Sequence, residues 1–414
     1  MSLDSLCTEL IVKICSYLNI NDLCSLKQTS KRYYDVISSW AEVLCKKDPL
    51  TVVTNQNNDK FVSNCYRKLH QWDKYRVSRN WVKGKYTVKC FPISKKRLLP
   101  DLKMTDKYLW ISRGEHIFCY KRNTEGVDIR NPEAVLLGKR GNDVINFQIK
   151  NDMLVSAYGN GSIALCDNPT EGTTLNCELC HDSDINSIDV NEAGTMVVSG
   201  CREGKLKIWS IVKENELMLD LNNLANVQEL TRKVSISDFN NNEIAVSTRL
   251  ALSLYDLNKL RSPLTLTDLN KNIVGVNDIK WDGLYTFWTC GHDSLVRHWD
   301  LRLGRCVKRF LDPCDAALYC LELDQCNTIL AGAQSHGRVT LWDSRLREAL
   351  QIYFTTSNQT VHKSSPVYSL AFDADYLYTA TDCNLNFLNF AGYTDNILDH
   401  RFFLQRSYKV SLER

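Results

Sequence analysis

The sequence predicts a mainly β protein, a seven-bladed β-propeller preceded by a small cluster of three helices and a helical linker. Three observations lead to this prediction. One motif recurs at a nearly constant step along the last three quarters of the chain. Apolar residues within each copy alternate with the two-residue period of a strand. The first forty-odd residues show the three- and four-residue steps of helices instead, so the chain joins two different kinds of unit.

The N-terminal segment is predicted to form three short helices. Its first helix carries one apolar stripe, made of Leu6, Leu10, Ile11, Ile14 and Leu18. Asn21 and Asp22 are a plausible cap for a second helix that presents Leu23 and Leu26. A third helix runs from Lys31 toward Trp40. Three helices of this length cannot bury a self-sufficient core, so an apolar surface is expected to remain for a partner.

Residues 49–85 are predicted to form a linker, polar at first and then helical. Residues 51–100 carry 12 Lys and Arg against 2 Asp and Glu, whereas the whole chain has a formal net charge of +3. A local basic stretch of this kind is most often a solvated helix face. The charge pattern therefore does not indicate a nucleic-acid-binding protein, and Lys95–Arg97 is only a weak cue for RNA binding.

The repeats are clearest in three copies, Met196–Ser210, Thr289–Asp300 and Leu330–Asp343. Each has an apolar strand, a tight turn and a second strand that ends in a large ring. The closing position steps by about 43 to 46 residues through six copies, at Tyr120, Cys166, Trp209, Tyr255, Trp299 and Trp342. A seventh copy closes near Phe390. Four strands in this length make one propeller blade.

The ring must also close, because an open sheet edge invites pairing with other chains. Either Tyr86–Phe91 or the tail around Arg401–Leu404 can supply the outer strand of the last blade. The sequence leaves both alternatives open.

The motifs resemble known families. The run from Leu6-Cys-Thr-Glu-Leu10 to Ser30-Lys-Arg-Tyr33 resembles an F-box, with Cys7 where that family has proline. The repeats over about residues 98–395 resemble WD repeats, although Trp-Asp survives only at Trp299 and Trp342. Together with the segment Asn80-Trp81-Val-Lys-Gly84, these two resemblances make the whole chain similar to F-box/WD-repeat proteins. Its length and irregular repeats resemble the dactylin-like branch of that family.

The resemblance implies three parts, with the F-box at 1–48, the linker at 49–85 and the propeller at 86–414. It implies a non-catalytic substrate receptor of a Skp–cullin–F-box ubiquitin ligase, whose partners are a Skp-type adaptor and, through it, a cullin and a RING subunit. The alternative is a WD-repeat scaffold that acts without a cullin. The residues expected to form or support the adaptor surface are Leu6, Leu10, Ile11, Ile14, Leu18, Leu23, Leu26 and Trp40.

In this family, the substrate usually binds the face that carries the turns between the second and third strands of the blades. Those turns contain Arg113, Tyr158, Arg202, Arg249, His292, Gln334 and Asp382. Three arginines and a histidine on one rim suit an acidic or phosphorylated protein substrate. Alternatively, each side chain faces solvent independently.

No phosphate loop, nucleophile elbow or metal helix occurs, so neither catalysis nor a cofactor or metal is expected. Cys177-Glu-Leu-Cys180-His181 matches a haem-attachment pattern, but it falls in a blade loop, where His181 is expected to bond Glu203. The 17 cysteines are scattered, as in reduced proteins. With no signal or membrane segment apparent, we expect no membrane partner, no nucleic acid, and a cytoplasmic or nuclear location.

Overall fold

The computed structural model describes most of the chain. The described residues are 5–18, 20–44, 52–93, 99–138, 141–171, 175, 177–213, 217–227, 229–240, 242–257, 264–266, 268, 275–355, 365–392, 394, 397–402 and 404. Lys95–Arg97 lies outside them. Among the helices they form, none has both the length and the apolar character needed to cross a membrane.

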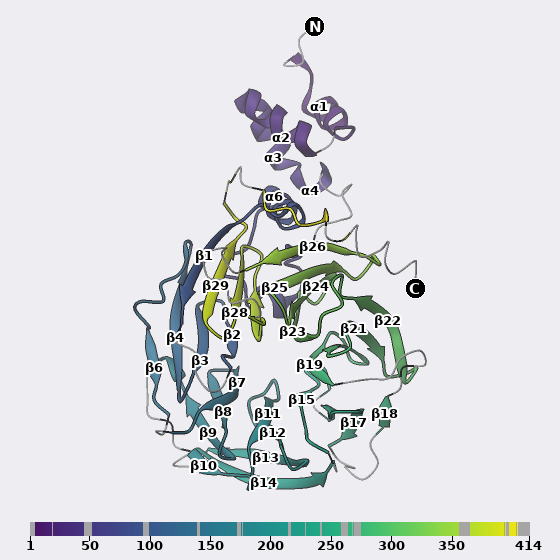
Figure 1. Ribbon diagram of the computed structural model, residues 1–414. Helices are drawn as coiled ribbons and strands as arrows, with labels where there is room; N and C mark the ends of the chain where they lie inside the picture. Colours follow the sequence, from purple (N-terminus) through teal and green to yellow (C-terminus); the bar gives the residue numbers. More distant parts are fainter. Residues whose placement is uncertain are drawn as a thin grey trace.

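The α-helices of the described residues precede the first strand, and the first four stand at one edge of the ring of sheets (Figure 1). In the described part of the chain they are α1 (Thr8–Cys15), α2 (Ile20–Thr29), α3 (Lys31–Ser39), α4 (Ala41–Leu44), α5 (Asp59–Val62) and α6 (Gln71–Lys83). Because α2 begins at Ile20, the prediction that Asn21 and Asp22 cap it is wrong; they lie in its first turn. Ser30 instead caps α3 by accepting a hydrogen bond from the backbone N–H of Tyr33.

The sheets form seven blades around a central channel, which confirms the predicted propeller (Figure 1). Blade one contains β2 (Leu102–Met104), β3 (Tyr108–Arg113), β4 (His116–Asn123), β5 (Gly126–Val127) and β6 (Ala134–Leu136); blade two contains β7 (Val144–Lys150), β8 (Met153–Tyr158), β9 (Ser162–Asp167) and β10 (Cys177–Leu179); and blade three contains β11 (Ile185–Val190), β12 (Met196–Cys201), β13 (Lys205–Lys213) and β14 (Leu217–Asn226). Blade four contains β15 (Lys233–Ile236), β16 (Glu243–Ser247), β17 (Leu252–Asp256) and β18 (Leu264–Leu266), and blade five contains β19 (Val276–Trp281), β20 (Thr286–Gly291), β21 (Leu295–Asp300) and β22 (Arg305–Leu311). Blade six contains β23 (Leu318–Leu323), β24 (Thr328–Ala333), β25 (Arg338–Asp343) and β26 (Ala349–Phe354), and blade seven contains β27 (Ser369–Phe372), β28 (Tyr376–Ala380), β29 (Asn384–Asn389) and β1 (Thr87–Pro92). A short 3₁₀ helix, Pro169–Glu171, lies between β9 and β10.

The last blade is closed by β1, the segment that directly follows α6. Six residues of β1 pair antiparallel with β29, from Thr87 opposite Asn389 to Pro92 opposite Asn384. Of the two alternatives, the structure therefore selects the segment around Tyr86–Phe91. The C-terminal tail has another place, because Leu404 packs against blades five and six. N- and C-terminal strands thus share one sheet, which removes the open edge.

The two faces of the propeller are not equivalent. We call the face with the turns between second and third strands the upper face, and the face with the turns between first and second strands the lower face. Residues 52–67 run across the lower face, where Lys60 pairs with Asp238 in blade four and Arg67 forms two hydrogen bonds to Asp375 in blade seven. Residues 52–67 therefore cover the lower side of the channel.

Buried hydrogen bonds hold the blades together internally. His181 Nε2 lies 2.7 Å from Ser199 Oγ, which also accepts a hydrogen bond from Trp209 Nε1 at 2.9 Å. The expected bond between His181 and Glu203 is wrong, because Glu203 pairs with Lys205 at the surface, 3.2 Å away. His181 thus has the structural role of a blade residue, joining a loop to the strands beside it.

Candidate functional site

The F-box-like helices pack around a small apolar core. Its buried members include Ile11 and Cys15 of α1, Leu23 of α2 and Ile37 of α3. Ile11 and Leu23, which were expected to form or support the adaptor surface, are buried in this core and are placed to support that surface from within. Leu6, Leu18 and Leu26 pack against this core and stay partly exposed.

Three of the predicted adaptor residues remain exposed. Leu10 is 47% exposed and Ile14 is 40% exposed, and they are neighbours on one face of α1. Trp40, directly after α3, is 41% exposed. The sequence analysis missed Tyr17, which is 77% exposed and continues the Leu10–Ile14 face one turn further. Large apolar side chains gathered on so small a unit mark a protein-binding surface.

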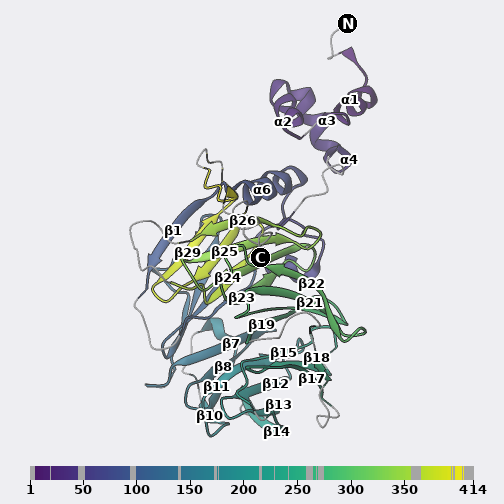
Figure 2. The same ribbon diagram turned by 45° about the vertical axis from the view of Figure 1, so that its right-hand side comes forward.

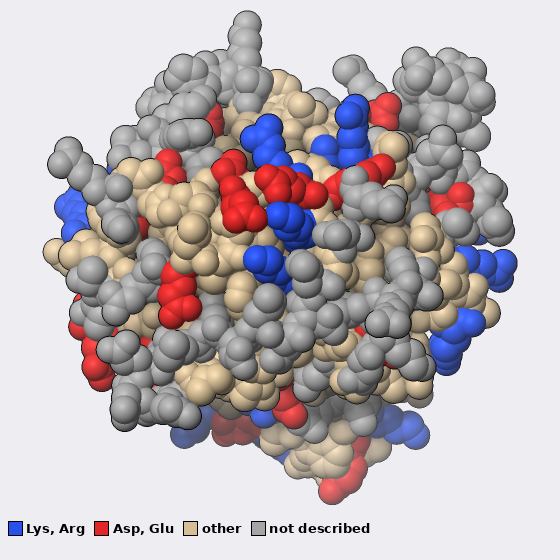
Figure 3. Space-filling view, turned by 90° about the horizontal axis from the view of Figure 1, so that it is seen from below, with Lys and Arg blue, Asp and Glu red and all other residues tan. Residues whose placement is uncertain are grey.

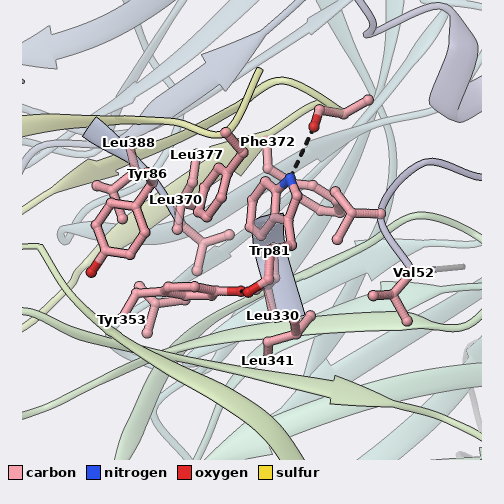
Figure 4. Close-up of a cluster of buried hydrophobic side chains, with 14 of the residues drawn as sticks. Val52, Trp81, Tyr86, Leu330, Leu341, Tyr353, Leu370, Phe372, Leu377 and Leu388 are labelled. Carbon is pink, nitrogen blue, oxygen red and sulfur yellow. Dashed lines mark hydrogen bonds between the residues drawn. The ribbon is translucent and has the colours of Figure 1, made fainter. Parts of the chain in front are cut away.

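Helix α6 connects this cluster to the propeller. Near its start, Trp72 packs against the core of the F-box-like helices. Near its end, the Trp81 ring stacks on Phe390 with 3.7 Å between ring centroids, and Trp81 Nε1 donates to the Ala374 carbonyl at 2.9 Å. Figure 4 shows Trp81 enclosed by Tyr353, Phe372 and other apolar side chains of the last two blades. Both ends of α6 are thus anchored.

The chain reverses tightly after α6. Gly84 has a positive φ of 66°, the left-handed conformation that ends many helices. A Cβ at this position would lie 2.3 Å from the carbonyl oxygen of Leu398, so only glycine fits. The contact ties the C-terminal segment across the end of α6, and Leu398 N–H donates to the Gly84 carbonyl. The sequence segment Asn80–Gly84 is therefore a docking element between linker and ring.

The upper face contains most of the predicted substrate residues. Arg202, Arg249, His292 and Gln334 are exposed there, and Arg113 and Asp382 are partly exposed. Tyr158 is fully buried in a core cluster of the first two blades, so its prediction as a binding residue is wrong. Its degenerate repeat uses a tyrosine for packing where other blades expose a polar side chain.

Three further residues at the upper mouth of the channel were missed by the sequence analysis. They are Arg232, Tyr319 and Tyr368, each at or just before the start of an inner strand. Tyr319 is the extra residue in a register shift between Leu318 and Cys320. Such a bulge turns a side chain toward the channel, which simple alternation does not reveal.

The upper mouth has a basic side and an aromatic side. A cavity of about 370 Å³ is lined by Arg202 and Arg232 together with Asp184. Arg232 donates to Asn277 Oδ1 at 3.1 Å, which orients its guanidinium. Burial and the neighbouring Arg232 lower the pKa of His292, which disfavours its charged form. The positive charge expected on this rim therefore comes mainly from the arginines.

The aromatic side continues from His292. The ring centroids of His292 and Tyr319 are 5.6 Å apart, and those of Tyr319 and Tyr368 are also 5.6 Å apart. Below this level, the channel wall is charged but internally paired, with Lys233 Nζ 2.9 Å from Asp278 and Lys280 Nζ 2.5 Å from Glu322. In the described residues, no group of three or more His, Cys, Asp or Glu side chains could hold a metal ion.

A helix cluster with an exposed apolar face, anchored through one helix to a propeller, is the architecture of an F-box/WD-repeat protein. The comparisons confirm this resemblance in both parts of the chain. Residues 3–46 match the F-box-like family model, and residues 172–210 match the model of the WD domain, G-beta repeat.

Two curated proteins are similar along nearly the whole chain. F-box/WD repeat-containing protein 4 of Homo sapiens is 27% identical over 393 residues, which cover 92% of this chain and 91% of the relative. The Mus musculus protein of the same name is also 27% identical and covers 92% of each chain. Proteins of this kind are generally non-catalytic adaptors.

Among solved structures, the computationally designed Ika8 protein is similar in fold. It is 17% identical, with a TM-score of 0.51, and the match covers 70% of this chain and 82% of that one. At this identity the likeness concerns the fold alone.

Proposed function

We propose that this chain is the substrate receptor of a Skp–cullin–F-box ubiquitin ligase. The observation that carries the proposal is the exposed apolar face of Leu10 and Ile14, together with the exposed Trp40, on a helix cluster that stands away from the ring (Figure 2). This face docks the Skp-type adaptor, through which a cullin and a RING subunit are recruited. The chain itself performs no chemistry.

The function follows from tethering. A substrate lysine held near a ubiquitin-loaded enzyme reacts in an effectively intramolecular step, and the effective concentration depends on how stiff the connection is. Anchoring of α6 at Trp72 and Trp81 supports a stiff connection between adaptor and substrate. The scaffold alternative would not require a fixed distance of this kind.

The substrate site in this proposal is the upper face. Residues 52–67 of the same chain cover the lower mouth of the channel, so we place the ligand at the upper mouth. Arg202, Arg232 and Arg249 favour an acidic or phosphorylated segment, because guanidinium groups bind carboxylate and phosphate through paired hydrogen bonds. The cytoplasm or nucleus is the compartment that suits this activity and the free thiols of the described cysteines.

Co-purification from cells tests the adaptor surface. Tagged Leu10→Asp/Ile14→Asp protein is expected to lose both adaptor and cullin, because two carboxylates then face an apolar partner. A matched control, Leu303→Asp/Leu311→Asp, places the same charges at exposed leucines of blade five and retains both partners. Wild-type protein that recovers adaptor without cullin would favour the scaffold alternative, and recovery of neither would refute the proposal.

A further inference from the structure

A groove of about 1370 Å³ lies between the F-box-like helices and the start of α6, apart from the apolar face and the upper mouth. One wall is α2 and α3, and the other is the segment from Lys68 to Arg76. Pockets for drug-sized ligands have volumes of roughly 300–1,000 Å³. This groove is larger and open along its length, so its size fits an extended segment of polypeptide.

One face of helix α3 lines the groove, while another face packs into the core of the helix cluster. Tyr33, Val36 and Ile37 point into the core of the cluster. Lys31, Tyr34, Asp35 and Ser38, which repeat at helical steps, line the groove on the other side. The groove wall is therefore a second surface of the same helix, independent of the residues that hold the cluster together.

The groove is electropositive. Five cationic side chains and His70 line it, against two carboxylates: Lys27, Lys31, Lys68, Lys74 and Arg76 against Asp35 and Asp73. One of the carboxylates is neutralised locally, since Asp73 Oδ1 accepts a hydrogen bond from Arg76 at 2.7 Å. Three of the cations come from the basic stretch of residues 51–100, which α6 brings opposite Lys27 and Lys31. The remaining charge favours an anionic ligand.

Two residues that line the groove each have a buried polar atom with no hydrogen-bond partner among the described residues. These atoms are Ser38 Oγ on α3 and Trp72 Nε1 on α6. An indole N–H can only donate, and a hydroxyl can donate as well as accept. Leaving such groups unpaired is unfavourable, and a ligand whose acceptor oxygens reach them would relieve that cost.

Aromatic rings complete the site. The Lys27 ammonium lies 4.5 Å from the centroid of the Tyr34 ring and 5.2 Å from that of Trp72. This arrangement joins the two walls and holds a cation above an apolar floor. Carboxylates on a ligand would meet the ammonium groups while its aliphatic parts contact the rings.

We propose that this groove binds an acidic segment of a partner polypeptide. Carboxylates suit the cationic lining of the groove, and peptide carbonyls are acceptors for groups such as Ser38 Oγ and Trp72 Nε1. A nucleic acid fits less well, because Asp35 lies on the wall and the cationic groups are confined to one short groove instead of following a backbone. On the side of the molecule drawn in Figure 3, the coloured Lys/Arg and Asp/Glu side chains are interspersed in small groups, unlike the groove. The proposal holds whether or not the chain acts in a ligase.

Fluorescence anisotropy with the full chain and a labelled octaglutamate peptide tests the proposal. The peptide is expected to bind, and binding should weaken as salt is raised, since exposed charges are screened beyond about 10 Å at 0.1 M. Lys31→Glu/Lys68→Glu should reduce affinity about tenfold or more, because two attractions become repulsions. Trp72→Phe, which keeps the ring and removes the N–H, should also weaken binding.

The matched control is Lys107→Glu/Lys121→Glu, which changes the net charge equally at exposed positions of blade one. It should leave peptide affinity unchanged. Equal loss in both double variants, binding of octaglutamine as tight as octaglutamate, or tighter binding of a single-stranded oligonucleotide that the groove variant abolishes would each overturn the proposal. Far-ultraviolet circular dichroism and melting temperature confirm that both variants are folded.

Discussion

At the scale of single residues, periodicity found exposed side chains of the first helix but missed some at the mouth of the channel. Leu10 and Ile14 lie where a 3.6-residue period places them, because a helix repeats its faces regularly. Tyr319 was missed because a shift in strand register changes which side chains face the channel, and Arg232 was missed because it directly precedes its strand. Tyr158 was misplaced because a degenerate repeat does not reveal whether its turn residue packs inward.

His181 provides a pH-dependence prediction. Burial, followed by the positive charges of Lys207 and Lys205, lowers the pKa of His181 to about 4. An unfolded chain has a histidine pKa of about 6.5, so it binds more protons than the folded chain between these values. The stabilisation is complete above about pH 6.5 and is lost as the pH falls toward 4.

The variant His181→Gln should remove this contribution. Its melting temperature should be lower than that of the wild type at pH 7, because the bond to Ser199 is lost, and the difference should shrink steadily toward pH 4. Differential scanning fluorimetry across this range measures the effect. His336→Gln, the same substitution at an exposed position, is the matched control. A difference for His181→Gln that does not vary with pH would contradict the assignment.

At the scale of elements, the boundaries and pairing partners of the helices and strands were harder to predict than their existence. The helical character of residues 71–83 follows from the sequence, but the choice of β1 over the tail as closing strand does not, since both segments are short and apolar. The start of α2 shifted because a turn-favouring pair such as Asn21–Asp22 is also accepted in a first helical turn, where negative charge is favourable.

Helix α6 should fail as a connector if its C-terminal anchor is removed. Trp81→Ala deletes a fully buried ring and should cost about 3–5 kcal/mol of stability. Limited proteolysis should then cut the 52–86 region faster, and the melting temperature should fall. Trp81→Phe keeps part of the stacking on Phe390 and should have an intermediate effect. Unchanged cleavage in the alanine variant would show that α6 is held by other contacts.

At the scale of the whole molecule, the repeat period was sufficient for the architecture. A step of about 43 to 46 residues gives the number of blades even where the motif has decayed to Cys166 or Tyr255. What the period cannot provide is the relation between ring and helices, which rests on long-range contacts such as Trp81 with Phe390. Nor does it show that residues 52–67 cover the lower mouth.

Ring closure by β1 predicts a difference between otherwise similar outer strands. In Val88→Pro/Lys89→Pro, one of the two lost N–H groups must face β29, because neighbouring residues of a strand point their N–H groups to opposite sides. The variant should melt at a lower temperature than Leu264→Pro/Thr265→Pro, which disturbs the regularly paired outer strand β18 without opening the ring. Equal melting temperatures of the two variants would show that β1 is not needed to close the ring.

The pairing of β1 with β29 also has a consequence for biosynthesis. The ribosome releases residues 87–92 long before residues 384–389, and at about 5–20 residues per second the interval is on the order of tens of seconds. During that time β1 has no partner strand, so its unpaired backbone groups must be protected within the nascent chain. A premature stop codon anywhere before the final hairpin would leave this strand permanently single, so even late truncations should yield protein that quality-control proteases remove.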